Sequence, residues 1–263
     1  MLPNLRLLSL TSISLLALLS TTANAADESN GPPKKEGWNF EAGAVAMYGP
    51  AYEGSDKYEV EALPNISVDY EDGLFFANPF DGIGSYPIQG EDYKLGASLG
   101  YEFGRDEKDD KKNLRGMGDI DSSATANLMG EYEFGPIEIS GKLTKGNSDY
   151  GMTAEADVGT SFEVTDRIML MSEVGATWAN ADHMNTYFGV SSAQATRSGY
   201  RSYKSESGIK SVGINVGAFY SVTEDIDAVL MVEADQLLGD AADSPITKSD
   251  FQPSMMLGVN YKF

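Results

Sequence analysis

A lone histidine and two serines are the residues of this chain whose types could support nucleophilic catalysis. His183 lies in the stretch 181–208, which also contains Ser191 and Ser192. A histidine within hydrogen-bonding reach of a serine can activate the hydroxyl, which here would favour lipid hydrolysis at a membrane surface. A single histidine in a loop is more often an ordinary loop residue, and nothing else resembles a catalytic constellation. We therefore predict no catalytic residues and no enzyme activity.

Composition excludes several other kinds of chemistry. The chain has 263 residues, no cysteine and one histidine, so thiolate catalysis, disulfides, iron–sulfur clusters and multi-histidine metal sites are excluded. It carries 40 acidic against 19 basic residues, a formal charge of −21. Nucleic-acid binding needs a basic face, so no nucleic-acid partner is expected. We predict no metal and no cofactor.

The elements that position the polar side chains have a period of two residues. The stretch 123–134 alternates apolar and polar side chains, with Met129 as the exception, and 226–235 repeats the pattern, with Val229 and Met231 breaking the polar set. Successive side chains of a strand point to opposite faces. Each such segment is therefore expected to be a strand with one apolar and one polar face.

The length of these segments favours strands that cross a membrane. They run to about 8–13 residues, and a tilted strand needs roughly 9–11 to cross a bilayer. Two girdles of aromatic residues mark the interfaces of a membrane barrel. Aromatic residues near the segment ends are Trp38, Tyr48, Tyr58, Tyr70, Phe134, Phe162, Trp178, Tyr220 and Tyr261. The amphipathic segment that ends on Phe263 is typical of the last strand of bacterial outer-membrane barrels.

We predict an all-β fold, a transmembrane antiparallel up-and-down β-barrel of about twelve strands. Its strands are expected at 38–48, 58–70, 73–79, 83–88, 93–103, 122–134, 137–145, 151–163, 167–180, 209–221, 226–237 and 254–263. The third and fourth are short and interrupted by Pro79 and Gly82, so ten strands is the alternative. With twelve strands and periplasmic termini, the short links fall inside and 104–121, 181–208 and 238–253 fall outside.

The N-terminal segment has the features of an export signal. Arg6 precedes an apolar run from Leu7 to Leu19, and an Ala-Asn-Ala cleavage site ends at Ala25. These features predict a secretory signal peptide over residues 1–25. Residues 26–37 are then a flexible periplasmic arm and residues 38–263 the barrel. The predicted location is the outer membrane of a Gram-negative bacterium.

The inward face of this barrel would be mostly acidic. The inward acids are expected to be Glu41, Glu59, Glu61, Asp69, Glu102, Glu131, Glu133, Glu138, Glu155, Asp157, Glu163, Glu173, Asp227, Glu233 and Asp235, and the inward cations Lys94, Lys142, Lys210 and Lys262. A hydrated or plugged polar interior explains this pattern most simply. The alternative is a narrow cation-preferring pore. Twelve strands enclose too little space for a wide diffusion channel.

One loop carries a dense mixture of charges. Residues 105–112 read RDEKDDKK. We interpret them as a solvated loop, with contact to divalent ions or lipopolysaccharide as the alternative. The expected surroundings of the chain are outer-membrane lipid and lipopolysaccharide.

Three groups of residues resemble a known family. They are PAYEGSD at 50–56, YEFGRD at 101–106 followed by LRGMGDID at 114–121, and YFGVSSAQA at 187–195. Together they resemble the family of MltA-interacting protein and outer membrane protein V, over essentially the whole mature chain. The resemblance implies an outer-membrane barrel without catalytic activity that joins a murein lytic transglycosylase to a murein synthase. Other members are linked to osmotic adaptation, adhesion or antibiotic susceptibility, and no catalytic residue is carried over.

The sequence supports three alternative hypotheses about the function of the chain. The first is a scaffold for periplasmic murein enzymes, implied by the resemblance. The second is a narrow cation-preferring channel, indicated by the acidic lumen, and the third is a surface adhesin, indicated by the long outer loops. The scaffold meets a physical difficulty, because only the arm at 26–37 and the short inner turns could dock a partner. A standard interface buries about 800 Å² on each partner.

Overall fold

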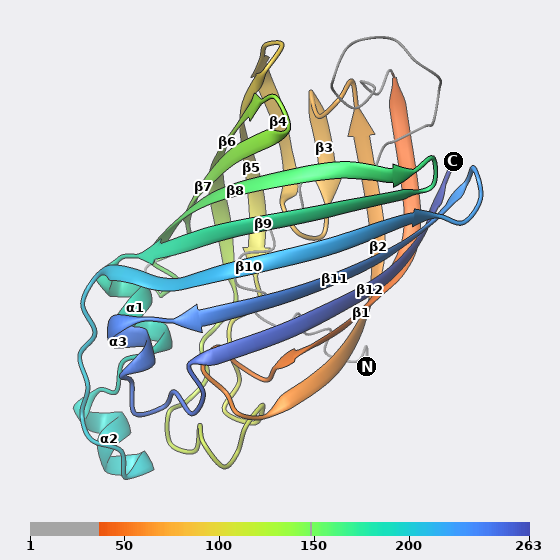
Figure 1. Cartoon of the computed structure of the whole chain (residues 1–263). Helices are drawn as coiled ribbons and strands as arrows, with labels where there is room; N and C mark the ends of the chain where they lie inside the picture. The colour runs from red at the N-terminus through yellow and green to blue at the C-terminus, as the bar shows by residue number, and fades with distance from the viewer. Residues whose placement is uncertain (1–36, 148) are drawn as a thin grey trace.

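The segments with alternating apolar and polar side chains form strands, and these strands pair edge to edge into a closed barrel (Figure 1). The computed structural model describes residues 37–147 and 149–263. All twelve neighbouring pairs are antiparallel, and β1 pairs with β12 to close the wall. The strands are β1 (Trp38–Pro50), β2 (Tyr58–Tyr70), β3 (Phe75–Asn78), β4 (Gly82–Gln89), β5 (Tyr93–Glu102), β6 (Ser123–Phe134), β7 (Ile137–Lys145), β8 (Met152–Thr165), β9 (Ile168–Ala179), β10 (Gly208–Ser221), β11 (Ile226–Leu237) and β12 (Phe251–Lys262).

The predicted twelve-stranded barrel is confirmed, and ten strands is wrong. Most strand boundaries lie within two residues of the predicted ones. The largest difference is at β12, which begins at Phe251 rather than at 254 because Pro253, which points away from the lumen, is accommodated in the strand opposite Ala234. The predicted signal peptide at 1–25 and all of the predicted arm except Gly37 lie outside the described residues.

Two aromatic girdles surround the outer surface, as the sequence predicts. At the end that carries the short turns, Trp38 contacts Tyr70, with ring centroids 4.7 Å apart. At the opposite end, the rings of Tyr48 and Tyr58 are 5.3 Å apart. Between the girdles the outward side chains are exposed and apolar, such as Leu99 at 70%. This belt is the lipid-facing surface of a membrane barrel.

The closing seam of the barrel depends on a glycine. Gly43 of β1 lies opposite Asn65 of β2 on one side and Asn260 of β12 on the other. The Asn65 amide donates a 2.9 Å hydrogen bond to Asn260 Oδ1, passing over Gly43 inside the barrel. A Cβ at this position would collide with the Val259 carbonyl oxygen and with Asn260. The missing side chain therefore lets β2 and β12 bond across β1.

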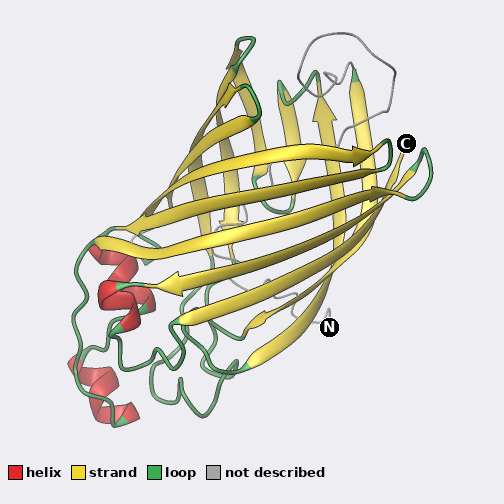
Figure 2. Cartoon of the chain, in the orientation of Figure 1, coloured by secondary structure: helices red, strands yellow, loops and turns green. Residues whose placement is uncertain are grey.

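Long loops and short helices gather at one end, and tight turns at the other (Figure 2). The sequence did not predict the helices, which are α1 (Ala181–Tyr187), α2 (Ser192–Ser198) and α3 (Gly239–Ala242). Asn180 caps α1, and Ser191 with Gln194 forms a capping box on α2. Within the described part of the chain, none of the helices is long and apolar enough to cross a membrane. Barrels of this type carry short turns on the periplasmic side, so the loop-rich end faces outward.

Candidate functional site

The inside of the barrel carries the predicted acidic side chains. On β9, for example, Glu173 is 5% exposed, whereas the neighbouring Val174 is 54% exposed on the lipid side. All four predicted inward lysines lie beside a carboxylate. The ion pairs are Lys94–Asp72 at 3.2 Å, Lys142–Asp81 at 3.0 Å, Lys210–Glu53 at 2.8 Å and Lys262–Asp227 at 3.0 Å. The inward cations therefore neutralise part of an acidic interior.

One wall of the interior is apolar, which the sequence interpretation missed. A buried cluster, here called the inner apolar patch, lies on the inward face of β1, β2 and β9–β12. Its members are Val45, Met47, Leu63, Met169, Met171, Phe219, Val229, Met231 and Met256. All of them stand at positions where the alternation predicts polar residues. The lumen therefore has an apolar side as well as an acidic one.

The short β3–β4 hairpin reaches the inside of the barrel. Asn78 Oδ1 accepts hydrogen bonds from the backbone N–H groups of Phe80, at 2.8 Å, and Asp81, at 2.7 Å. This turn directs Phe80 onto the inner apolar patch and Asp81 toward Lys142. The hairpin therefore divides the lumen between the apolar wall and a polar cavity.

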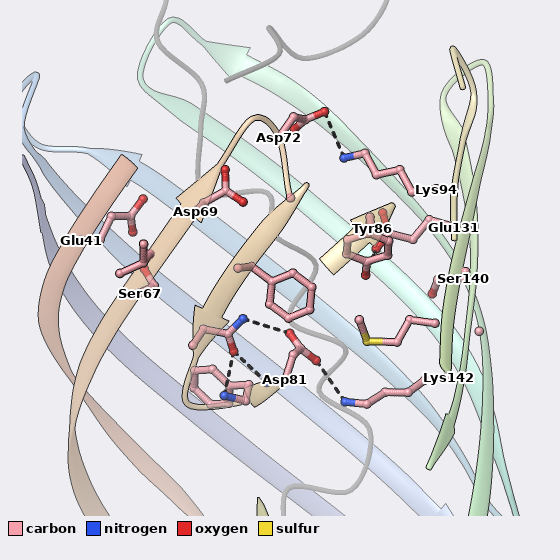
Figure 3. Close-up of a pocket in the computed structure, with 18 of the residues that line it drawn as sticks. Glu41, Ser67, Asp69, Asp72, Asp81, Tyr86, Lys94, Glu131, Ser140 and Lys142 are labelled. Carbon is pink, nitrogen blue, oxygen red and sulfur yellow. Dashed lines mark hydrogen bonds and ion pairs between the residues drawn. The ribbon is translucent and has the colours of Figure 1, made fainter. Parts of the chain in front are cut away.

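That cavity lies between the hairpin and β5–β7, toward the periplasmic end (Figure 3). The space within it that atoms do not fill is about 1100 Å³, which includes open solvent at its mouth. The Asp72–Lys94 pair lies near its periplasmic side, and the Tyr86 hydroxyl donates a 2.6 Å hydrogen bond to Glu131. The side chains of Phe76, Phe80 and Met129 supply apolar surface to the same cavity. The cavity is therefore amphipathic and rich in carboxylates.

The outer end of the barrel is covered by four interlocking segments, 51–57, 103–122, 180–207 and 238–250, here called the outer cap. Arg105, after β5, donates from Nη1 to the Tyr187 carbonyl oxygen at 2.9 Å, and Tyr187 precedes β10, five strands away in the wall. The Tyr52 hydroxyl donates to the Ile246 carbonyl oxygen at 2.8 Å. The Arg105 contact joins segments from distant strands and so crosses the mouth of the barrel, whereas the Tyr52 contact ties together the loops on either side of the β1–β12 seam.

The outer cap is held by buried polar groups as well as by apolar packing. Lys210 Nζ lies 2.8 and 3.0 Å from the two Glu53 carboxylate oxygens, and both side chains are less than 10% exposed. Burial lowers the pKa of Arg105 and raises the pKa of Tyr52. Phe188 in the apolar part is fully buried, together with Met184. These features are those of a packed domain core rather than of solvated loops.

His183 and the two serines are not brought together as a catalytic pair. His183 Nδ1 lies 2.9 Å from the Tyr150 carbonyl oxygen, and its ring stacks on Tyr187 with centroids 4.5 Å apart. Ser191 instead caps α2, where its hydroxyl accepts a hydrogen bond from Gln194, and Ser192 is exposed in α2. Burial, followed by the Lys210 charge, lowers the pKa of His183 to about 3. A neutral, enclosed imidazole of this kind is a packing residue of the outer cap.

The charged stretch 105–112 is only partly solvated. Lys108, Lys111 and Lys112 are exposed, as the sequence predicts. Arg105 and Asp110 are buried instead, and Asp110 accepts a 2.7 Å hydrogen bond from the Asn113 amide. These two residues anchor the loop in the outer cap. Among the described residues, no group of three or more His, Cys, Asp or Glu side chains could hold a metal ion.

These features together define the class of the protein. A closed twelve-stranded wall, a lipid-facing apolar belt between two aromatic girdles, a polar interior and one loop-rich end make the chain an outer-membrane β-barrel. A family model described as MltA-interacting protein MipA matches residues 42–263, and the chain belongs to that family.

One relative and two solved structures are similar to the chain. The chain is 26% identical over 188 residues to a 24 kDa outer membrane protein of Pasteurella multocida (strain Pm70), covering 72% of this chain and 67% of that protein. Its structure is similar to a bacterial polysaccharide outer membrane secretin, with a TM-score of 0.47, 9% identity and coverage of 85% and 98%. It is also similar to the NanC porin, with a TM-score of 0.44, 8% identity and coverage of 86% and 100%.

Proposed function

We propose that this chain is a non-enzymatic outer-membrane barrel that docks a murein lytic transglycosylase on its periplasmic face, and that it links this enzyme to a murein synthase during cell-wall turnover. The proposal takes its partner from the description of the family, which names an interaction with MltA. The contacts of His183 fit a packing role, since its Nδ1 lies 2.9 Å from the Tyr150 carbonyl oxygen and its ring stacks on Tyr187.

The difference between the outer and the periplasmic end of the barrel is the main support for the proposal. The outer end is bridged by the packed contacts of the outer cap, whereas the amphipathic cavity lies toward the periplasmic end. An open pore would need a continuous path through the outer mouth. A barrel with one covered end and one accessible end is better suited to binding on the accessible side. This observation favours the scaffold over the channel, and the adhesin stays a prediction.

The chemistry of the periplasmic rim indicates what kind of surface would bind there. Four of its five turns carry exposed acidic residues, and Arg167 is the one basic residue among the turn positions. The exposed turn acids are Glu71, Glu91, Asp92, Asp166, Glu224 and Asp225. Complementary charge speeds association and selects partners. We therefore expect the bound enzyme to present a basic face, with the residues at 26–37 adding contact area to the turns.

Binding of purified lytic transglycosylase to the immobilised full-length mature barrel tests the proposal. A rim variant carrying Glu91→Lys, Asp92→Lys, Glu224→Lys and Asp225→Lys should weaken binding at least about tenfold, since reversed rim charges slow association and repel the partner. A matched control, Asp149→Lys with Glu206→Lys, reverses two exposed acids of the outer end and should bind as the unmodified chain does. No binding by the unmodified barrel, or equal binding by the rim variant, would overturn the proposal.

A further inference from the structure

Three methionines stand side by side on the inner wall of the barrel. Met47 of β1 is the register partner of Met256 of β12, and Met256 is the register partner of Met231 of β11. Directly opposed residues on one face have Cβ atoms about 4.5–5.5 Å apart. All three side chains are at most 2% exposed. Because each sulfur lies on a flexible, unbranched side chain, three thioethers can converge on one point.

A fourth methionine extends this group. Gly217 of β10 is the register partner of both Met231 and Met171. A Cβ on Gly217 would lie 2.7 Å from Met171 Cγ and 3.1 Å from Met171 Sδ, so the Met171 side chain occupies the space above the glycine, on the side of Met231. Met47, Met256, Met231 and Met171 form one continuous line, here called the methionine row.

Packing alone does not account for the choice of residue. The lipid-facing surface of the same strands is built mainly from other apolar types, such as Val174, Leu230 and Leu257, with Met255 as an exception. Five of the nine members of the inner apolar patch are methionine, from a chain total of 11. Leucine would fill similar volume. What methionine adds is a soft sulfur donor, and thioethers select soft cations such as Cu(I).

The surroundings of the methionine row offer a cation a route of entry. Phe80 lines the periplasmic cavity and also packs against the patch that contains the row. A single side chain, that of Phe80, therefore lies between the cavity and the patch. The carboxylates of Asp72, Asp81 and Glu131 line that cavity. Like charges in a low-dielectric cleft raise the local concentration of counter-ions. A cation that enters the cavity from the periplasmic end would need only a rotation of Phe80 to reach the patch.

We propose that the methionine row is a binding site for a soft monovalent cation of the Cu(I) class, held by the thioether sulfurs of Met47, Met231 and Met256, with Met171 available as a fourth donor. Binding involves no change of oxidation state, because the ion enters and stays as the monovalent form. The site is independent of partner docking at the periplasmic rim.

Titration with Ag(I), a redox-inert ion with the same preference for thioethers, tests the site. The refolded mature barrel in detergent micelles should bind one Ag(I), and the methyl resonances of methionines in the row should shift on binding. The variant Met231→Leu with Met256→Leu should lose at least about tenfold in Ag(I) affinity, because two donors are removed while the volume is kept. Retention of the folded barrel is checked by its heat-modifiable mobility on gels.

Met255→Leu is the matched control, because Met255 neighbours Met256 in sequence but is 44% exposed on the lipid face. Its Ag(I) affinity should equal that of the unmodified chain. A folded double variant that binds Ag(I) as tightly as the unmodified chain would overturn the proposal. So would an unmodified barrel whose row methyl resonances do not respond to Ag(I).

Discussion

The Lys210–Glu53 ion pair lies inside the outer cap, where water cannot solvate either charge. Removing one partner of a buried pair leaves the other charge uncompensated, which costs about 3–5 kcal/mol. We therefore expect Lys210→Met to lower the free energy of unfolding by roughly that amount. Urea unfolding in lipid vesicles, followed by the fluorescence of Trp178 at the outer end of β9, measures the change.

Replacing both charges is the control for this pair. The double variant Lys210→Met with Glu53→Leu has no orphaned charge, and we expect it to regain most of the lost stability. A double variant no more stable than Lys210→Met alone would mean that the pair acts through other contacts.

Titration of His183 should make the stability of the outer cap depend on pH. The folded-state pKa of His183 is about 3, below the value of about 6.5 expected in the unfolded chain. Between these two values the unfolded chain binds the extra proton. The contribution of His183 is therefore complete above about pH 6.5 and falls toward pH 3, by at most about 1.4 kcal/mol per pH unit.

His183→Phe keeps the ring stacked on Tyr187 and removes the titration. Carboxylates in the lumen also titrate at acid pH, so the quantity to measure is the difference in unfolding free energy between this variant and the unmodified chain. The difference should change between pH 6.5 and pH 4. A difference that is constant over this range would contradict the burial of a neutral imidazole.

At the level of single residues, the sequence predicted the acidic face of the lumen well and its apolar face poorly. Strand alternation places Glu173 and Asp235 inside because each has an outward apolar neighbour, Val174 and Ala234 respectively. Met129, Val229 and Met231 are exceptions to that rule in the sequence. The inward direction of Val229 and Met231 was the available signal for the inner apolar patch, and that of Met129 for the apolar part of the cavity.

Among the strands, the β1–β12 seam depends most clearly on a single position. Gly43→Ala would place a methyl group against the Val259 backbone carbonyl and the Asn65–Asn260 hydrogen bond. Backbone atoms cannot move aside without breaking the strand pairing, so we expect slow and incomplete closure of the barrel. The fraction of heat-modifiable, folded protein after refolding into vesicles measures this effect.

Gly141→Ala provides the comparison within another strand. A Cβ at Gly141 would meet only the Glu155 carbonyl oxygen at 3.5 Å, an ordinary contact. This variant should refold as completely as the unmodified chain. Equal refolding of Gly43→Ala and Gly141→Ala would show that the seam tolerates a side chain.

Strands and helices differed in how far the sequence could predict them. Alternation over about ten residues is a strong local signal, and it located the long strands. The short strands β3 and β4, with 4 and 8 residues, carry too little of it, and their prediction depended on turn residues and an even strand count. The helices α1, α2 and α3 span only 7, 7 and 4 residues, too few for a helical period to appear. The capping box of Ser191 with Gln194 was a local signal for α2, whereas the sequence analysis considered Ser191 only as a possible nucleophile.

For the whole molecule, the sequence predicted the barrel and its orientation but not the state of its two ends. The barrel closes because an even number of strands pairs antiparallel all the way round, and local sequence patterns indicated both the number of strands and their pairing. The outer cap depends on contacts between residues far apart in sequence, such as Arg105 with Tyr187 and Tyr52 with Ile246. Local patterns carry no information about such contacts, so the preference for a hydrated or plugged interior over an open pore rested on composition alone.

The contacts of the outer cap close the outer mouth, and the proposed binding surface is periplasmic. Single-channel recording of the refolded mature barrel in planar bilayers tests this most directly. We expect no steady current from the unmodified chain, and a cation-selective current from a variant in which residues 181–207 are replaced by a short glycine linker, because the acidic lumen is then uncovered. A steady cation-selective current through the unmodified chain would contradict the account and make transport the primary function.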